Sequence, residues 1–299
     1  MRCIGLLVVP FAIGMVWSTL SFAQETKHFR VEHDKNYQSI TLNYSASSGI
    51  CYLAIGESED AVSIYSSRDI DEFNHTFNKN QKGKDLQVKL SLDEKNNESF
   101  SQSISNKVFA TSKPEDNIWK VILVEDIPYN LNLTYGIGTA FIDLAGLSVS
   151  NLKVKTGSAD VNIGYLTSMP NYVEMDTMAI KVDLGNVTVR QIDQANVNNI
   201  VAEVGFGNML LDMADPIDKA CHVKASVGAG NLEIIIPKSD IPIIVKVKKS
   251  LLCDVKLTRS FTEKEDNIFV NTAYTEGADE ILEFEVDVSF GSIIFKEKR

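Results

Sequence analysis

The feature that most constrains the fold is an alternation of apolar and polar residues that changes parity at a glycine and then resumes. Around Gly228, apolar residues stand at odd offsets before the glycine, from Val223 to Val227, and at even offsets after it, from Leu232 to Ile236. A period of two is typical of strands with one buried face, and helical spacing is nearly absent from the chain. The sequence therefore predicts an all-β protein.

This pattern recurs along the second half of the chain, and each copy can be aligned on one corner residue. The corner residues are Gly136, Gly157, Met178, Gly205, Gly228, Ser250 and Ser289. The copy around Ser250 slips by one residue, as a β-bulge would cause. Units of ~21–23 residues with one apolar face cannot bury that face alone, so their coils are expected to stack. We expect a β-solenoid of such stacked coils.

An antiparallel β-meander is the alternative topology. The glycines at the corners would then begin two-residue hairpin turns, where glycine is preferred in first position. Met178 argues against it, because a bulky residue with positive φ is costly. Stacked coils are favoured, with the meander left open.

One stretch of the chain resembles a known family. It comprises Trp119 to Leu123, Ile127-Pro128 and the segment LNLTYGIGTAFIDLAGLSVSNLKVKTGSADVNI from Leu131 to Ile163. It resembles the toast-rack domain, which is related to the C-terminal domain of the LiaF cell-wall-antibiotic-response regulators and to adhesin-like proteins of the bacterial envelope. The resemblance implies a right-handed β-solenoid in an envelope protein without catalytic residues. The chain lacks the membrane helices of the LiaF regulators.

The N-terminus predicts export. Arg2 precedes an apolar run from Ile4 to Leu20, and Ala23 completes a small-residue cleavage site. We expect a signal peptide over residues 1–23 and a mature protein in the periplasm, on the cell surface or outside the cell, with no transmembrane helix after signal removal. A retained N-terminal anchor is the alternative, because the run approaches the length that spans a bilayer.

Two further segments follow the signal peptide. Residues 24–117 read as an N-terminal β segment with polar loops, and residues 118–299 as the toast-rack-like repeat domain. Whether the first of these is a separate sandwich or the opening coils of one solenoid is left open.

Net charge argues against one class of partner, and the number of cysteines argues against a disulfide framework. The formal charge of −11 repels phosphate backbones and argues against nucleic acid. Cys51, Cys221 and Cys253 remain after processing, an odd and scattered set that is no disulfide framework. We expect them to be buried as small apolar residues, with one disulfide left open.

No catalytic motif was found. The chain has no nucleophile elbow, no paired zinc-ligand motif, no Cys-x-x-Cys and no phosphate-binding loop. None of the four histidines stands two or four residues from another, the spacing that presents paired metal ligands. We therefore expect no catalytic, cofactor-binding or metal-binding residue, no cofactor, and a protein that is not an enzyme.

Equivalent positions in successive coils predict rows of like residues. Asp160, Asn208 and Asn231 stand three residues past their corners, and the last two come from consecutive copies that could form an amide ladder. Asp143 and Asp212 share another offset, but three coils of about 4.8 Å would separate them by roughly 14 Å, too far for one ion. Four residues past their corners, one buried column is predicted: Val161, Val182, Met209 and Leu232.

These features predict a non-catalytic, adhesin-like binding module of the envelope, whose partner is an unknown envelope protein or surface polymer. A polysaccharide-acting solenoid enzyme is the alternative from another class, and it would need clustered carboxylates. A regulatory partner in envelope stress is suggested by the resemblance alone.

Overall fold

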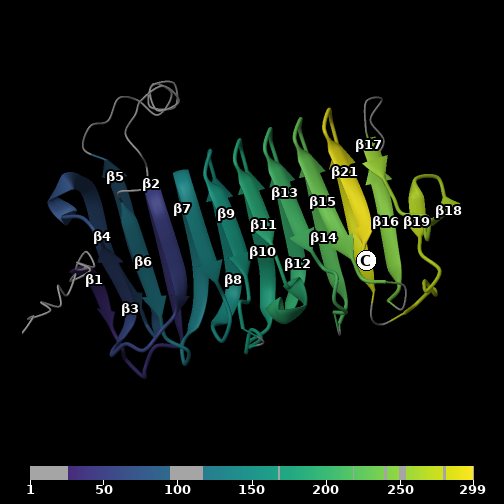
Figure 1. Ribbon diagram of the computed structural model, residues 1–299. Helices are drawn as coiled ribbons and strands as arrows, with labels where there is room; N and C mark the ends of the chain where they lie inside the picture. Colours follow the sequence, from purple (N-terminus) through teal and green to yellow (C-terminus); the bar gives the residue numbers. More distant parts are fainter. Residues whose placement is uncertain are drawn as a thin grey trace, which may run out of the picture.

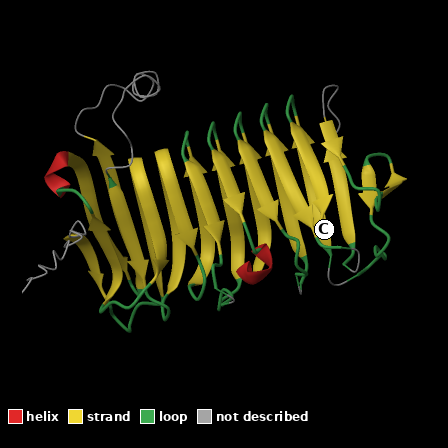
Figure 2. Ribbon diagram, in the orientation of Figure 1, coloured by secondary structure: helices red, strands yellow, loops and turns green. Residues whose placement is uncertain are grey.

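The computed structural model describes residues 26–94, 117–167, 169–217, 219–238, 241–248, 254–278 and 281–298. The signal-peptide prediction lies outside these residues. The described chain is built from strands, with two short 3₁₀ turns, η1 (Ile70–Glu72) and η3 (Ile192–Ala195). Figure 2 shows the strands side by side in one elongated stack. The all-β prediction is confirmed.

Each central coil consists of a first strand, a three-residue corner and a second strand. The first strands are β8 (Ser148–Thr156), β10 (Met175–Val182), β12 (Val197–Val204) and β14 (Cys221–Val227), and the second strands are β9 (Asp160–Gly164), β11 (Asn186–Val189), β13 (Asn208–Asp212) and β15 (Asn231–Ile236). First strands pair with first strands and second with second, always in parallel (Figure 1). The coils therefore stack as the repeat predicts, and these strands do not form an antiparallel meander.

The alternation in each strand directs one set of side chains into a core between the two strand layers. In the second layer, one buried column runs from coil to coil: Val161, Val187, Met209, Leu232 and Ile293. The shared offset predicts Val182 in this column as well. That placement was wrong, because Val182 ends β10 in the first layer and pairs with Thr156 and Val204.

The error at Val182 has one source, the choice of Met178 as a corner. Met178 lies in the middle of β10, fully buried, and pairs with Leu152 and Ile200. The corner of this coil is the segment 183–185. Met178 has an ordinary negative φ, so the positive-φ argument does not apply to it.

The third corner position carries the real constraint. A Cβ added at Gly185, Gly207, Gly230 or Gly291 would lie 2.0–2.1 Å from a carbonyl oxygen of the preceding coil. No side chain fits at that distance, so the backbones approach closely only where this residue is glycine. At the first corner position of the central coils the approach is looser, since an added Cβ would lie 2.9 Å from a carbonyl oxygen at Gly205 and 3.0 Å at Gly228. Asp183 stands at this position in the coil of β10 and β11.

The order of coils in space differs from their order in the sequence. The penultimate coil, β16 (Ile243–Lys248) and β17 (Asp254–Lys256), does not pair with β14 and β15. Instead the last coil, β20 (Leu282–Val288) and β21 (Ser292–Glu297), lies between them and pairs in parallel on both sides. Figure 1 shows β21 between β15 and β17.

The slip of one residue predicted around Ser250 is confirmed by this pairing. Lys248 pairs with Asp287 and Asp254 with Ser292, so the paired positions are separated by five residues in one coil and by four in the other. The corner around Ser250 itself lies outside the described residues.

Charge explains why the last coil is inserted. The outward side chains of β20 are Glu283, Glu285 and Asp287, whereas the neighbouring strands present Lys224 on β14 and Lys246 and Lys248 on β16. In the sheet register, Glu285 stands opposite Lys224 on one side and opposite Lys246 on the other. Stacking in sequence order would place these two lysines side by side, and like charges directly opposite each other destabilise a sheet. The acidic strand between two basic strands removes that repulsion.

The N-terminal end shows the same exchange of order. β2 (Ser39–Ile55) lies between β7 (Pro128–Asp143) on one side and β5 (Asp85–Glu94) and β6 (Ile118–Leu123) on the other. β2 and β7 are long strands that run through the corner and belong to both layers. Residues on either side of position 117 therefore share one sheet.

Antiparallel strands cover both ends of the stack. At the N-terminal end, β4 (Phe73–Lys82) pairs with β5, while β3 (Asp60–Ser66) pairs with β6 and with β1 (Thr26–Glu32). At the other end, β19 (Ile268–Val270) pairs with β16 and with β18 (Thr262–Glu265). Among the described residues, no further strand covers the two outer faces of the layers between these ends.

Candidate functional site

The charged face is the outer face of the first layer, formed by the outward side chains of β10, β12, β14, β20 and β16. It contains a groove of about 530 Å³ lined by charged residues of both signs: Glu203, Lys224, Lys246, Lys248, Glu285 and Asp287. Carboxylates of neighbouring strands lie close to the cations, with Lys248 Nζ 2.8 Å from Asp287 Oδ2 and Lys181 Nζ 3.1 Å from Glu203 Oε2. These ion pairs balance much of the positive charge of the lysines with carboxylates of the same face.

The centre of the charged face is ionised at neutral pH. The Lys246 ammonium, hydrogen-bonded to Glu283, holds the pKa of that carboxyl below its usual value against the opposing effect of partial burial. The same bond raises the pKa of Lys246. The His222 ring lies 3.6 Å from Glu283 and 3.8 Å from Glu285. The Lys246–Glu283 pair is therefore an ion pair and not a general acid with a raised pKa.

The amide face is the outer face of the second layer, formed by the outward side chains of β9, β11, β13, β15 and β21 together with the adjacent halves of β2 and β7. Its main feature is a row that we call the amide ladder: Asp160, Asn186, Asn208, Asn231 and Ser292, which are register partners in five successive coils. Each amide points along the stack and not away from it, because each is bonded to its neighbour.

Hydrogen bonds connect the amide ladder in one direction. Asn186 Nδ2 donates to Asp160 Oδ1 at 2.7 Å, Asn208 Nδ2 to Asn186 Oδ1 at 2.8 Å, and Asn231 Nδ2 to Asn208 Oδ1 at 3.0 Å. Ser292 Oγ donates to Asn231 Oδ1 at 2.8 Å and completes the row. The predicted contact between Asn208 and Asn231 is confirmed. Asn186 was missed because Met178 displaced the register of its coil, and Ser292 because its coil is out of order in space.

A shallow groove runs beside the amide ladder. It has a volume of about 300 Å³ and is lined by the ladder amides and by half-buried side chains that include Thr188, Leu210 and Ile294. The groove therefore places apolar surface next to a regular row of hydrogen-bonding groups.

Two exposed aromatic rings continue the amide face toward the N-terminal end. Tyr52 of β2 and Phe141 of β7 are register partners whose rings stack with centroids 5.2 Å apart and planes 13° apart. They are 40% and 41% exposed. Phe141 is followed in the same row by Asn162 and then by Thr188, so the aromatic pair and the groove lie on one line.

The two carboxylates that share an offset lie apart and have local roles. Asp143 accepts hydrogen bonds from the backbone N–H groups of Ala145 and Leu166, both at 3.1 Å. Asp212 accepts one from Ala214 at 3.1 Å. Each fixes the loop that follows its strand. Neither carboxylate is brought to the other.

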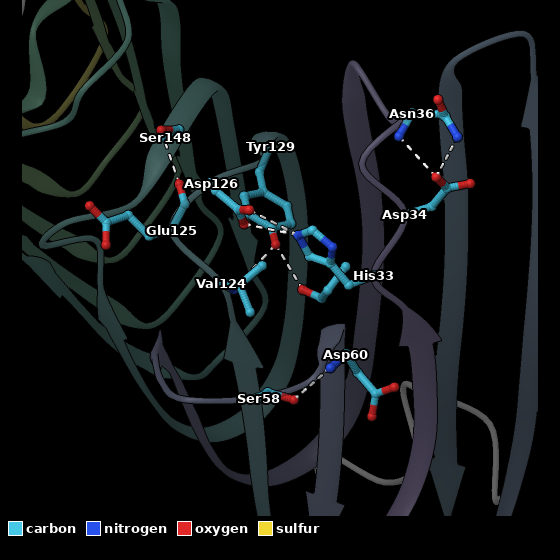
Figure 3. Close-up of polar contacts among 11 residues, drawn as sticks. His33, Asp34, Asn36, Ser58, Asp60, Val124, Glu125, Asp126, Tyr129 and Ser148 are labelled. Carbon is cyan, nitrogen blue, oxygen red and sulfur yellow. Dashed lines mark hydrogen bonds and ion pairs between the residues drawn. The ribbon is translucent and has the colours of Figure 1, made fainter.

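A polar cluster at the N-terminal end contains the one close histidine–aspartate contact in Figure 3. His33 Nε2 lies 3.0 Å from Asp126 Oδ1. The nearby Tyr129 hydroxyl donates to the Ala61 carbonyl at 2.7 Å and accepts from the Val124 N–H at 3.3 Å. This hydroxyl is engaged by backbone on both sides, so the cluster joins loops and offers no activated nucleophile.

The described cysteines are buried and free. Burial raises the pKa of Cys51 to about 11 and that of Cys221 to about 12, so both thiols are protonated at neutral pH. Cys253 lies outside the described residues. In the part of the chain that the structure describes, no group of three or more metal-ligating side chains occurs, and no helix is long and apolar enough to cross a membrane.

The family is decided by a match to a family model described as the N-terminal domain of toast_rack, DUF2154, over residues 21–190. The chain belongs to the toast-rack family. The match covers more than half of the sequence and continues across position 117. It spans the strands from β1 to β11. No curated protein matches the sequence.

Two solved structures are similar to this toast-rack chain over most of its length. A "putative cell adhesion protein" from Clostridium sporogenes is 17% identical and covers 92% of this chain and 100% of its own, with a TM-score of 0.46. A "putative adhesin" from Bacteroides fragilis is 12% identical and covers 91% of this chain and 97% of its own, with a TM-score of 0.33.

Proposed function

We propose that this protein is an exported, non-catalytic, adhesin-like module that holds an envelope partner or a surface polymer against its amide face. The observation that carries the proposal is the amide ladder, in which side-chain amides are fixed at regular intervals before any ligand arrives. Groups held in place in this way lose little conformational freedom on binding, so more of their interaction energy appears as affinity.

A binding role is favoured over a polysaccharide-acting enzyme by the positions of the carboxylates. Glycoside hydrolysis needs two carboxyl groups within about 5–9.5 Å of each other, one of them with a raised pKa. On the charged face Glu283 is paired with Lys246, and on the amide face Asp143 is bound to backbone N–H groups. Incubation of the protein with polysaccharides is expected to release no reducing ends.

Export follows from the predicted signal peptide over residues 1–23. We propose a mature protein that begins at Gln24 and resides in the periplasm or on the cell surface. N-terminal sequencing of the exported form checks this, and an intact Met1 in the membrane fraction would favour the retained anchor instead.

The binding role is tested with fluorescently labelled protein that begins at Gln24, added to intact cells and to isolated envelopes of the organism that makes it. Saturable binding is expected, and the triple variant Asn186→Ala, Asn208→Ala, Asn231→Ala should lose most of it. The matched control carries Lys181→Ala and Lys224→Ala on the charged face and should bind as the parent does. Equal loss in both variants, or no saturable binding by the parent, would contradict the proposal.

A further inference from the structure

We infer that the ligand of the amide face is a neutral polysaccharide chain that runs along the stack of coils. This inference rests on the proposed binding function and names the class of ligand. It is carried by the hydrogen-bonding capacity that the ladder leaves unused, by the exposed aromatic pair, and by the distribution of charge on this face.

The amide ladder uses only part of its hydrogen-bonding capacity. A primary amide has two N–H donors and an oxygen with two lone pairs. Asn208 spends one donor on Asn186 and receives one donor from Asn231. One N–H and one lone pair therefore remain on the exposed side chain. The same holds for Asn186, so the face offers donors and acceptors alternately at intervals of about 4.8 Å.

Hydroxyl groups match this supply because each is both a donor and an acceptor. A chain of sugar rings presents hydroxyls at regular intervals and could bond to successive amides. A protein strand adding to the sheet would need free backbone edges, and the backbone of these strands is already paired on both sides. The amide face therefore suits a polyhydroxylated chain better than an added peptide strand.

The aromatic pair extends the same line. Because the Tyr52 and Phe141 rings are stacked on each other, each ring has a second face that its partner does not cover. The C–H surface of a sugar ring is apolar and packs on aromatic faces. The half-buried Leu210 and Ile294 in the groove provide similar apolar contact further along.

Charge selects a neutral chain over an acidic one. Within the ladder, the single charged member is Asp160 at its end. In the neighbouring row, Glu233 is paired with Lys296 at 2.6 Å. The net charge of the whole chain is −11, which repels polyanions. The exposed Lys224 and Lys248 lie on the opposite face, where carboxylates already pair with them.

The inference is tested by competition for the binding of labelled protein to cells. Three competitors are prepared from the same envelopes: the neutral polysaccharide fraction that passes through an anion exchanger, the acidic fraction that it retains, and the protein fraction. The neutral fraction should compete, and periodate oxidation of its vicinal diols should abolish the competition.

Two variants on the amide face locate the site. The triple asparagine-to-alanine variant should weaken the binding of the neutral fraction by about tenfold or more, since several hydrogen bonds are lost. Phe141→Ala, which leaves the ladder intact, should weaken it by about fivefold. The charged-face control should stay within about twofold of the parent. Thermal melting establishes that each variant is folded.

The outcomes separate this inference from the function on which it rests. Competition by the acidic or protein fraction alone overturns the neutral polysaccharide and leaves the binding function standing. Loss of saturable cell binding in the parent overturns both. Competition by the neutral fraction that is unchanged by the triple variant and by Phe141→Ala overturns the amide face as its site.

Discussion

The two outer faces of the stack are built by the same coils, with the same period, and differ in how their side chains are satisfied. On the charged face, a cation of one strand meets a carboxylate of the next, as in the pair Lys248–Asp287. On the amide face, asparagine side chains bond along the stack, and Asn186 and Asn208 each keep a donor and an acceptor free. The charged face therefore favours one order of the coils, and the amide face keeps hydrogen-bonding groups available. Because the coils stack in register, a residue type that recurs at one position of each coil forms a row along the stack.

The two faces are the outer sides of two layers that share one core. The largest expected effect comes from burying a charge in either layer of that core. Val182→Asp in the first layer and Val187→Asp in the second would each bury an unpaired carboxylate, so each should cost about 4 kcal/mol or more of unfolding free energy. Urea titration measures this. If one variant is tolerated and the other is not, the two layers do not share a core equally.

The corner that joins the two faces provides the next test. Gly207→Ala should cost about 2–3 kcal/mol, because its Cβ would lie 2.1 Å from the Gly185 carbonyl oxygen. Gly164→Ala is the matched control, since its nearest neighbour would be at an ordinary 3.7 Å and little change is expected. A similar melting temperature for both variants would show that the coils can separate at the corner.

The ordering role of the charged face is tested by reversing one charge. Glu285→Lys would place three lysines side by side across β14, β20 and β16 and should cost about 1–2 kcal/mol. High salt should recover part of this loss, because the charges are exposed and screened. Glu285→Gln is the control and should cost less than half as much. A loss that does not respond to salt would indicate a packing defect instead.

The amide face is expected to behave differently in salt. Asn208→Ala removes two ladder hydrogen bonds between exposed groups and should cost about 1 kcal/mol, unchanged between low and high salt. Asn162→Ala, at an exposed asparagine beside the ladder, is the control. Equal stabilities of the two variants would mean that the ladder contributes nothing before a ligand binds.

The smallest expected effect concerns pH on the charged face. The pKa of Glu283 is lowered in the folded state by its bond to Lys246, so its contribution is present above the ordinary value of 4.5 and is lost as the pH falls through the lowered value. Glu283 is partly exposed, so this contribution is about 1 kcal/mol or less. Glu283→Gln should flatten the dependence of unfolding free energy on pH below about 4.5. An unchanged pH profile would contradict it.

Much of the fold could be predicted from the sequence because alternation and corner spacing are local signals. The register around Gly136, Gly157, Gly205, Gly228 and Ser289 is confirmed by the pairing, and so is the contact of Asn208 with Asn231. The corner of the coil that contains Met178 was assigned wrongly, because the alternation of apolar and polar residues there fits two different alignments. The closest backbone approach in this coil is at the third corner residue, Gly185, where an added Cβ would lie 2.1 Å from the Ala159 carbonyl oxygen.

The spatial order of the coils was harder to predict, because each coil presents similar apolar edges to any neighbour. Order was encoded outside the apolar pattern, in the acidic alternation from Glu283 to Asp287 and the basic alternation at Lys246 and Lys248. The amide ladder depends on that order, since Ser292 reaches Asn231 only when the last coil is inserted. Polar residues were therefore as informative for the topology as apolar residues.

The inserted coil has a consequence for the order in which the chain can fold. A chain that emerges from its N-terminus delivers β14 and β16 well before β20, whose place lies between them. Until residues 282–297 arrive, β16 can pair only with β19, and β17 has no partner among the described strands. The open edges of β14 and β15 can then pair with another chain. We expect assembly to wait for this final segment and not to proceed coil by coil from one end. A chain interrupted after β17 would therefore be exposed to proteolysis or aggregation, although most of its coils could already have formed.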